Sequence, residues 1–322
     1  MSPFNMDRRS VLAAAAYSAL LPIVARAETY PSHPIDLVVP VSPGGGTDTL
    51  ARLFADVARN YIGQPLTVLN RPGASATIGM GEIASARPDG YKIGLLVSEL
   101  AIVPHLGMGK VTLSDFRPIA GLNADPAGIT VRNDAPWKTL EEFIAAARAK
   151  PEAIKVGNSG AGSVWQFAAL ALESKAGIQF THVPYQGAAP AVMSLIGGHI
   201  DAVSVSVAEV SQHIVSGKLR CLGVMSDKRL KGFGVVPTLN ERGIDVEISV
   251  WRGLAAPRAT PDAVIDVLGN LARKVAADPA FVAGMDKANL GLVYSEAAAF
   301  GALIQRDSDG FKKLIVATKF KI

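Results

Sequence analysis

The chain has 322 residues, of which 49% are hydrophobic and 19% are charged, a composition that excludes an intrinsically disordered protein. The basic residues exceed the acidic ones by four without forming a cluster, so we expect no nucleic-acid partner. Cys221 is the single cysteine, which excludes an internal disulfide and a Cys-x-x-Cys metal or redox site.

Residues 1–27 have the pattern of a secretory signal peptide. Arg8 and Arg9 precede an apolar, alanine-rich run, residues 13–24, and Ala25-Arg26-Ala27 is a small-x-small cleavage pattern. The run is shorter than the roughly 18–20 residues that span a bilayer, which disfavours a membrane anchor. The paired arginines favour the twin-arginine route slightly over general secretion. We therefore expect export to the periplasm and cleavage near Ala27.

After the signal, short β-branched runs alternate with amphipathic helices, which predicts an α/β protein with parallel strands. In the first part of the chain, Leu50, Leu53, Phe54 and Val57 recur with helical spacing behind a predicted N-cap at Thr47 or Asp48. The strands that we expect around this helix and after it cover residues 35–40, 66–69 and 91–97.

A second set of strand–helix units follows residue 113. Thr139 is expected to cap a helix and Glu142 to complete a capping box. Pro190 should begin a short helix that ends at Gly197-Gly198, and Thr260 should cap a later helix. The strands expected here cover residues 129–131, 154–157, 181–185, 200–205 and 222–225.

This succession predicts two lobes, with the second inserted into the first. The chain would cross between them near Ile119 and Val250. After the signal at 1–27, the expected boundaries are 28–120 and 250–322 for lobe 1 and 121–249 for lobe 2.

Several expected strands end in a loop of small residues that leads directly into a helix. Free N–H groups at a helix start bind anions, and in open α/β sheets such loops gather at the carboxyl ends of the strands. Loops facing one cleft would suit a carboxylate, whereas the alternative is that each glycine loop only makes a tight turn. The loops cover residues 42–48, 70–75, 159–163 and 185–190.

Known catalytic motifs match this sequence less well than the pattern of anion-binding loops does. Residues 44–47 lack the lysine of a P-loop, and no expected strand leads into the Gly-x-Gly-x-x-Ala of residues 79–84. Residues 157–161 resemble a nucleophile elbow that ends in alanine, so a serine hydrolase of carboxylate esters using Ser159 is the alternative function. The five histidines are scattered, and we expect no metal and no cofactor.

A set of motifs occurs in a fixed order along the chain. They are Val39-Pro40, Pro43-Gly44-Gly45-Gly46-Thr47-Asp48, Asn70-Arg71-Pro72-Gly73-Ala74, Pro88-Asp89-Gly90-Tyr91, His182-Val183-Pro184-Tyr185-Gln186-Gly187, Gly197-Gly198-His199-Ile200-Asp201 and Trp251-Arg252-Gly253. Together they resemble the Bug family of periplasmic receptors, the TctC-like solute-binding components of tripartite tricarboxylate transporters, over essentially the whole mature chain. The resemblance implies an α/β, two-lobed periplasmic-binding-protein fold (type II-like), with two crossing segments and a cleft between the lobes.

The resemblance also implies a function in binding and not in catalysis. The ligand would be a small carboxylate (a di- or tricarboxylate or an aromatic carboxylate) that a monomer presents to membrane transporter subunits or to a membrane sensor. Loops of both lobes would hold it. The implied contacts are Pro43, Gly44, Gly45, Thr47, Asp48, Gly73, Ala74, Ser75, Ser98 and Glu99 from lobe 1, and Ser159, Gly160, Ser163, Tyr185, Gln186, Gly187 and Ala188 from lobe 2.

Three positions depart from the family pattern. Gln166 stands where the family often has histidine, Ser75 where a glycine is common, and Val205, beside Ser206, where Asp or Asn is common. We still expect Gln166 and Ser206 at the ligand. An amino-acid ligand is disfavoured without an acidic group at 205, unless Glu99 supplies the counter-charge.

Two large side chains have alternative roles. Arg252 could clamp a second carboxylate bidentately or form a salt bridge between the lobes, and we expect it among the ligand contacts. Trp165 could line the cleft or fill the core.

Overall fold

The computed structural model describes residues 30–318 and 320, so the predicted signal peptide and its cleavage position near Ala27 lie outside the described residues. The strands are β1 (Ile35–Val39), β2 (Leu66–Asn70), β3 (Lys92–Val97), β4 (Phe116–Arg132), β5 (Lys155–Asn158), β6 (Thr181–Pro184), β7 (Ala202–Ser206), β8 (Leu219–Val224), β9 (Ser249–Pro257) and β10 (Leu292–Glu296). They pair in the order β2-β1-β3-β9-β4-β7-β5-β6, and β8 and β10 also pair with β4.

Helices cover both parts of this sheet. They are α2 (Gly46–Ile62), α3 (Thr77–Ala84), α4 (Leu140–Ala149), α5 (Val164–Ala176), α6 (Ala188–Ile196), α7 (Val207–Val215), α8 (Asp262–Ala277), α9 (Pro279–Lys287) and α10 (Ala297–Thr318). Short 3-10 segments are η1 (Ser98–Ala101), η2 (Val103–Leu106), η3 (Leu113–Asp115) and η4 (Asn240–Arg242). Among the described residues, none of the helices combines the length and apolar character needed to cross a membrane.

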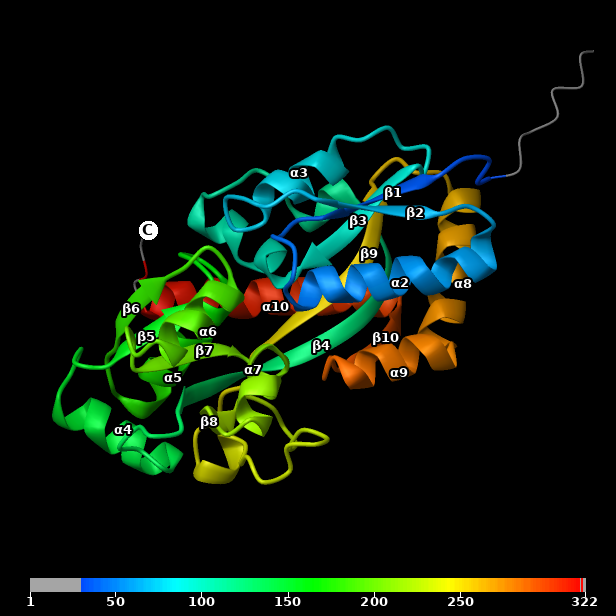
Figure 1. The fold of residues 1–322 in the computed structure, drawn as a ribbon. Helices are drawn as coiled ribbons and strands as arrows, with labels where there is room; N and C mark the ends of the chain where they lie inside the picture. The colour runs from blue at the N-terminus through cyan, green and yellow to red at the C-terminus, as the bar shows by residue number, and fades with distance from the viewer. Residues whose placement is uncertain (1–29, 319, 321–322) are drawn as a thin grey trace, which may run out of the picture.

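Strand β4 connects the two parts of the molecule. Its residues up to Pro126 pair with β9 and β10, and its residues from Ala127 onward pair with β7 and β8. Figure 1 shows β4 and β9 running between a lobe that contains β1, β2 and β3 and a lobe that contains β5, β6 and β7. Ile119 and Val250, the predicted crossing positions, lie in β4 and β9.

The expectation of parallel strands is correct among β1, β2 and β3 and among β5, β6 and β7, and it is wrong for the pairings of β4 and β9, including that of β9 with β3. β1 pairs parallel with β2 and β3, and β5 pairs parallel with β6 and β7. In contrast, β4 runs antiparallel to β7, β8, β9 and β10. β4 and β9 are antiparallel to each other because one strand carries the chain out of the first lobe and the other carries it back.

The core follows from side-chain alternation along β1. Leu37 and Val39 belong to the apolar cluster that includes Leu50 and Phe54 of α2, whereas Val38 belongs to the cluster on the opposite face of the sheet. Both faces of β1 are therefore buried, as expected for a strand in a parallel sheet that carries helices on both sides.

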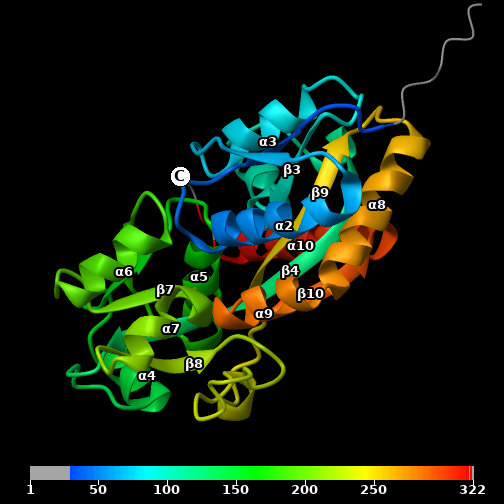
Figure 2. The same cartoon turned by 45° about the vertical axis from the view of Figure 1, so that its right-hand side comes forward.

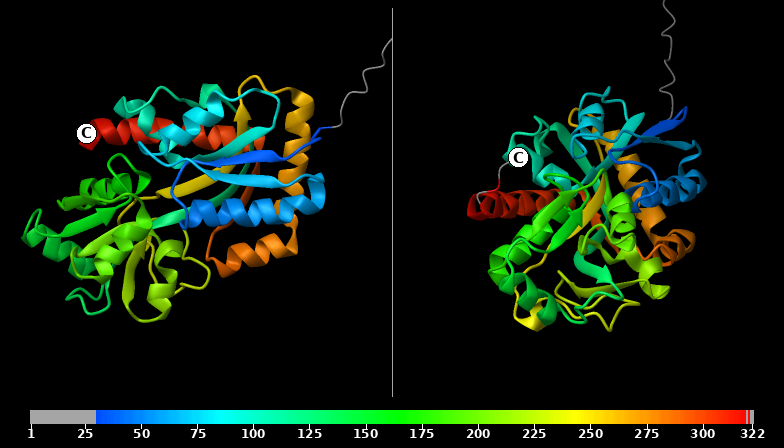
Figure 3. Two further views of the ribbon diagram at one scale, coloured as in Figure 1. Left: turned by 45° about the horizontal axis from the view of Figure 1, so that its top comes forward. Right: turned by 60° about the vertical axis from the view of Figure 1, so that its left-hand side comes forward.

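The C-terminal helices cover the lobes, as Figures 2 and 3 show. Helices α8 and α9 lie beside α2, and α10 runs along β4 toward α5 of the other lobe. At that end the Phe167 ring of α5 packs against Phe311 and Phe320, with ring centroids 5.9 and 5.2 Å apart. α10 is thus a third element that contacts both lobes.

The predicted N-cap of α2 is wrong. Gly45 is the N-cap, two residues before Thr47. The Thr47 hydroxyl accepts a hydrogen bond from Nε of Arg252 at 2.8 Å, and Asp48 accepts one from the Gly44 amide at 3.0 Å. Thr47 and Asp48 therefore lie within the first turn of the helix, and their side chains make these hydrogen bonds instead of capping it.

Other helix starts differ by one or two residues. α6 begins at Ala188 instead of Pro190, and the N-cap of α8 is Pro261 instead of Thr260. Thr139 does cap α4, accepting from the Glu142 amide at 3.3 Å. The Glu142 carboxylate, however, accepts from the amide of Lys138 at 2.5 Å, one residue before the position that a capping box requires.

We predict that Gly253→Ala destabilises the crossing region. A Cβ at Gly253 of β9 would lie 2.5 Å from the Ala120 carbonyl oxygen and 2.5 Å from Cε1 of Phe300. The carbonyl belongs to the neighbouring strand and cannot turn aside, so we expect a loss of about 1–3 kcal/mol in the free energy of unfolding, measured with urea.

Gly269→Ala is the matched control, because a Cβ at this position of α8 meets no atom within 4 Å. Alanine should stabilise this helix by up to about 1 kcal/mol. Equal effects of the two substitutions would show that the close packing at Gly253 does not constrain the crossing strand.

Candidate functional site

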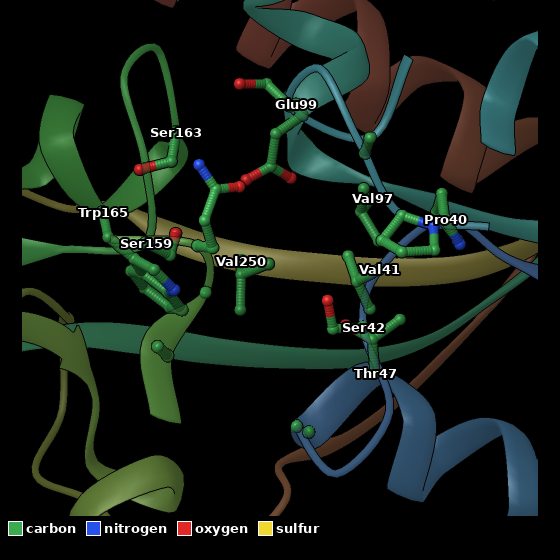
Figure 4. A pocket seen from close by; sticks show the side chains of 18 of the residues that line it. Pro40, Val41, Ser42, Thr47, Val97, Glu99, Ser159, Ser163, Trp165 and Val250 are labelled. Atoms are coloured by element: carbon green, nitrogen blue, oxygen red, sulfur yellow. The ribbon is translucent and has the colours of Figure 1, made fainter. Parts of the chain in front are cut away.

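A cavity of about 200 Å³ lies where the two lobes meet. Figure 4 shows the Glu99 side chain directed into this space, with Trp165 and Ser159 on one side and Pro40 and Thr47 on the other. The full lining consists of Pro40, Val41, Ser42, Pro43, Gly45, Gly46, Thr47, Pro72, Gly73, Ala74, Ser75, Ala76, Val97, Glu99, Ser159, Ser163, Trp165, Gln186, Gly187, Ala188, Ala189, Pro190, Glu209, Val250 and Arg252.

The N-termini of three helices without a side-chain cap border this cavity. The N-caps are Gly45 for α2, Ala76 for α3 and Gly187 for α6, and none makes a side-chain capping hydrogen bond. The first N–H groups of a helix have no acceptor within the helix, and they carry partial positive charge. The cavity therefore presents backbone donors suited to an anion from both lobes.

The loop before α3 has an uncommon backbone conformation. Ala74, Ser75 and Ala76 have φ values of 45°, 50° and 69°, in the left-handed region that residues with a Cβ seldom adopt. The Ser75 hydroxyl donates to the carbonyl of Ala161 in the other lobe at 2.9 Å, and Thr77 donates to Ala74 at 2.7 Å. Ser75, the departure from the family's glycine, thus joins the two lobes at the rim of the cavity.

Two carboxyl groups face the cavity, Glu99 after β3 and Glu209 in the first turn of α7. Glu99 accepts a hydrogen bond from the Val164 amide at 3.4 Å, and Glu209 accepts from the amide and hydroxyl of Ser206 at 3.2 and 3.3 Å. Burial away from water raises the pKa of Glu99, and it raises the pKa of Glu209 to about 7, although the charge of Arg252 opposes both increases.

Arg252 is buried in a polar network behind the cavity wall and is 2% exposed. Its Nη1 pairs with the Asp125 carboxylate at 2.5 Å and also donates to the Asn123 side chain, while Nε donates to Thr47. Asp125 accepts in addition from the Gly291 amide at 2.7 Å. The salt bridge, one of the two roles predicted for Arg252, is present, and Arg252 also belongs to the cavity lining.

The structure places most predicted contacts on the cavity wall. These are Pro43, Gly45, Thr47, Gly73, Ala74, Ser75, Glu99, Ser159, Ser163, Gln186, Gly187, Ala188 and Arg252. The predicted contacts that it places outside this lining are Gly44, Asp48, Ser98, Gly160, Gln166, Tyr185 and Ser206.

The side chains outside the lining support the loops that form it. Asp48 bonds to Asn70 at 2.9 Å and to Arg52, tying the start of α2 to the end of β2. Ser98 accepts from the Trp251 amide at 2.8 Å, which fixes η1 against β9.

The same holds in the second lobe. Gln166 accepts from the Gly162 amide at 2.7 Å and thereby closes the loop before α5. The Tyr185 hydroxyl bonds to Ser194 of α6 at 2.5 Å, and Ser206 is engaged by Glu209.

Sequence reasoning missed Glu209 and left Trp165 undecided. Glu209 lies three residues after Ser206, the spacing of a capping box at the carboxyl end of a strand, and this pattern could have pointed to it. Trp165 combines both of its predicted roles, because it is 4% exposed within the core and also borders the cavity.

The hydrolase alternative requires a base beside Ser159. Among the described residues no histidine hydrogen-bonds to Ser159, and His182 and His105 bond instead to Glu173 at 2.9 Å and to Ser308 at 2.8 Å. Within residues 30–318 and 320 there is also no group of three or more acidic, histidine or cysteine side chains placed to hold a metal ion.

Comparison with known proteins identifies the family to which this chain is similar. The tripartite tricarboxylate transporter family receptor model matches residues 50–320. A TctC solute binding protein from Polaromonas, solved without ligand, is 49% identical with a TM-score of 0.73, over 89% of this chain and 99% of that one.

Two further solved structures are similar. The periplasmic binding protein BugD is 30% identical with a TM-score of 0.84, over 91% of this chain and 99% of its own. MatC from Rhodopseudomonas palustris, solved with bound malate, is 25% identical with a TM-score of 0.82, over 89% of this chain and 100% of its own. The predicted α/β, two-lobed periplasmic-binding-protein fold is confirmed.

We predict that Arg252→Ala lowers the free energy of unfolding by about 3–5 kcal/mol, because it leaves the Asp125 carboxylate buried without its partner. Arg273→Ala is the control, since Arg273 pairs with Glu296 at 2.9 Å on the exposed surface and should cost at most about 1 kcal/mol. Urea denaturation of both variants tests the difference, and a loss at Arg252 no larger than at Arg273 would contradict a structural role for the buried pair.

We predict that Glu209→Gln stabilises the ligand-free protein in a pH-dependent manner. The pKa of Glu209 lies at about 7 in the folded protein, above its ordinary value of 4.5. The stability that protonated Glu209 contributes is therefore fully present below about pH 4.5 and is lost as the pH rises through about 7. Glutamine does not ionise, so the variant keeps this stability.

The free energy of unfolding of Glu209→Gln relative to wild type should rise by about 1–2 kcal/mol between pH 5 and pH 8. Glu152→Gln, at an exposed position between α4 and β5, serves as the control and should show no such change. A pH-independent difference at position 209 would mean that its carboxyl titrates as in the unfolded chain.

Proposed function

This chain belongs to the tripartite tricarboxylate transporter receptor family of periplasmic solute-binding proteins, and we propose that it captures a small carboxylate between its lobes without transforming it. The observation that carries the proposal is the meeting of three helix N-termini without side-chain caps, those of α2, α3 and α6, at one cavity. A carboxylate offers several lone pairs to such N–H groups, and hydrogen bonds to an ionised acceptor are stronger than those to a neutral one.

The size of the cavity supports a small ligand. Its volume of about 200 Å³ lies below the roughly 300–1,000 Å³ of sites for drug-sized molecules. The related MatC was solved with malate, a compact dicarboxylate. Among the lining residues, the loops at 43–47, 73–76 and 186–189 would contribute most of the backbone donors.

The contacts between the lobes support capture by closure. Besides the bond from Ser75 to Ala161, the Val164 amide of α5 donates to Glu99 across the cavity. We infer that lobe 1 (28–120 and 250–322) and lobe 2 (121–249) separate by bending at β4 and β9, and that ligand favours the closed form.

Membership of the family supports a proposal for the cellular role. We propose that residues 1–27 are removed near Ala27 after export, and that the receptor acts in the periplasm as a monomer. Its closed form would present the ligand to membrane transporter subunits or to a membrane sensor.

We predict that small carboxylates raise the Tm of the wild-type protein in a thermal-shift screen and that neutral sugars of similar size do not. Ala188→Pro then tests the backbone donors, because proline at the first position of α6 removes one N–H group while its φ suits a helix start. We expect at least a tenfold weaker affinity for whichever carboxylate gives the largest shift, measured by isothermal titration calorimetry.

Ala297→Pro at the first position of α10, which does not line the cavity, is the matched control and should leave the affinity unchanged. A sugar that shifts Tm more than every carboxylate would refute the ligand class. If Ala188→Pro binds the carboxylate as tightly as the wild type, the first amide of α6 is not a ligand contact.

A further inference from the structure

The crossing strand β9 lies between two hollows of the molecule. Val250 and Arg252 line the cavity between the lobes, whereas Ser249 and Trp251 line a second, larger groove of about 780 Å³. Successive residues of a strand point to opposite faces, so this groove lies on the face of β9 that is turned away from the cavity. We call it the back groove. Its floor is formed by Ser249 and Trp251 of β9 and by Ala124 of β4.

The two walls of the back groove belong to different lobes. One wall is a face of α10 that includes Leu303, Gly310 and Leu314, residues whose spacing puts them on one side of the helix. The other wall consists of Ala171 of α5 and of residues 245–248, which precede β9. The groove therefore spans the lobes at the crossing strands, as the cavity does on the opposite face.

One wall is fixed to the floor. The indole N–H of Trp251 donates to the Asp307 carboxylate at 2.9 Å, which ties α10 to β9. At one end of the groove the walls also touch, because the rings of Phe311 and Phe167 pack with centroids 5.9 Å apart. The wall that can change its distance from α10 is therefore the one formed by α5 and residues 245–248, with the aromatic contact as its pivot.

Opening of the cavity narrows the back groove. A bend at β4 and β9 that separates the lobes on one face of these strands brings the lobes together on the other face. In this structure the hydrogen bond from Ser75 to Ala161 joins the lobes at the cavity, and the back groove is wide. Val293 on its rim is 53% exposed. A narrower groove would bury this side chain and the apolar side chains of the walls, which favours the open form.

We propose that the back groove sets the balance between the open and closed forms, because its walls come together when the cavity opens and must separate before the cavity can close. This inference rests on the proposed function, since it requires lobes that separate by bending at β4 and β9. It makes residues that do not line the cavity, such as Gly310 and Val293, determinants of ligand affinity. A side chain that fills the groove keeps the walls apart and so holds the protein closed.

Substitutions of increasing size at Gly310 test the proposal. A Cβ at this position of α10 meets no atom within 4 Å, so the structure described here has room for a side chain. Gly310→Ala should leave the ratio of closed to open molecules unchanged, whereas Gly310→Leu should raise it about threefold and Gly310→Trp about tenfold or more. Gly269→Trp in α8 is the matched control, because a Cβ there also meets no atom within 4 Å and Gly269 does not line the groove.

The ratio is measured without ligand by double electron–electron resonance between spin labels. Ile78→Cys in α3 and Met193→Cys in α6 carry the labels, since these side chains are 55% and 59% exposed and do not line the cavity. α3 and α6 border the cavity from opposite lobes, so the open form gives the longer distance. The native Cys221 is buried, which raises the pKa of its thiol to about 11 and keeps it from reacting with the label.

The outcomes separate this inference from the proposed function. If the wild type populates the long distance and Gly310→Trp leaves the distribution unchanged, the inference is overturned, while carboxylate capture by closure stands. An equal shift in Gly269→Trp also overturns it, because bulk outside the groove would then have the same effect. A single short distance in the wild type would show that the lobes do not separate, which contradicts closure itself. Circular dichroism and Tm confirm that each variant is folded.

Discussion

The buried ion pair between Arg252 and Asp125 is the interaction on which the arrangement of the two lobes depends. Arg252 lies on β9 and Asp125 on β4, the strands that run between the lobes. The same guanidinium reaches Thr47 in the first turn of α2. One side chain therefore ties the paired crossing strands to a helix N-terminus at the cavity. Separating two charges this deeply buried is costly, which favours hinge bending in which β4 and β9 move together.

The cavity combines features that are usually found apart. Helix N-termini without side-chain caps favour an anion, whereas Glu99 and Glu209 place two carboxyl groups with raised pKa on the same cavity wall. Each lobe contributes to both features, since Glu99 follows β3 and Glu209 lies in the first turn of α7. The site is therefore complete only when the lobes meet, and the bond from Ser75 to Ala161 holds them together at the rim. The strained backbone at residues 74–76 is maintained by this contact and by the hydrogen bonds of α3.

Local features of the fold could be predicted because they depend on neighbouring residues. The buried face of α2, with Leu50 and Phe54, follows from the helical spacing of apolar residues, and the Thr139 cap follows from a short polar motif. The predicted N-cap of α2 was wrong because of a contact with a residue far away in the sequence. The Thr47 hydroxyl is engaged by Arg252, which is 205 residues away in the chain. Arg252 competes with the helix N–H groups for the Thr47 hydroxyl, and the sequence around the helix gives no indication of this contact.

The cavity at the ends of β1, β3, β5 and β6 was within reach of the sequence, because successive strand–loop–helix units bring their small-residue loops to one edge of a sheet. By itself the sequence determined those units, the ordered family motifs and the loops that carry backbone donors. Only the tertiary structure decided that Arg252 is neutralised by Asp125, that β4 and β9 run antiparallel, and that Glu209 joins Glu99 at the cavity. These facts depend on which side chains, distant in the sequence, come into contact when the chain folds. The net charge of a binding site is the sum of the charges on those side chains, so no single sequence motif determines it.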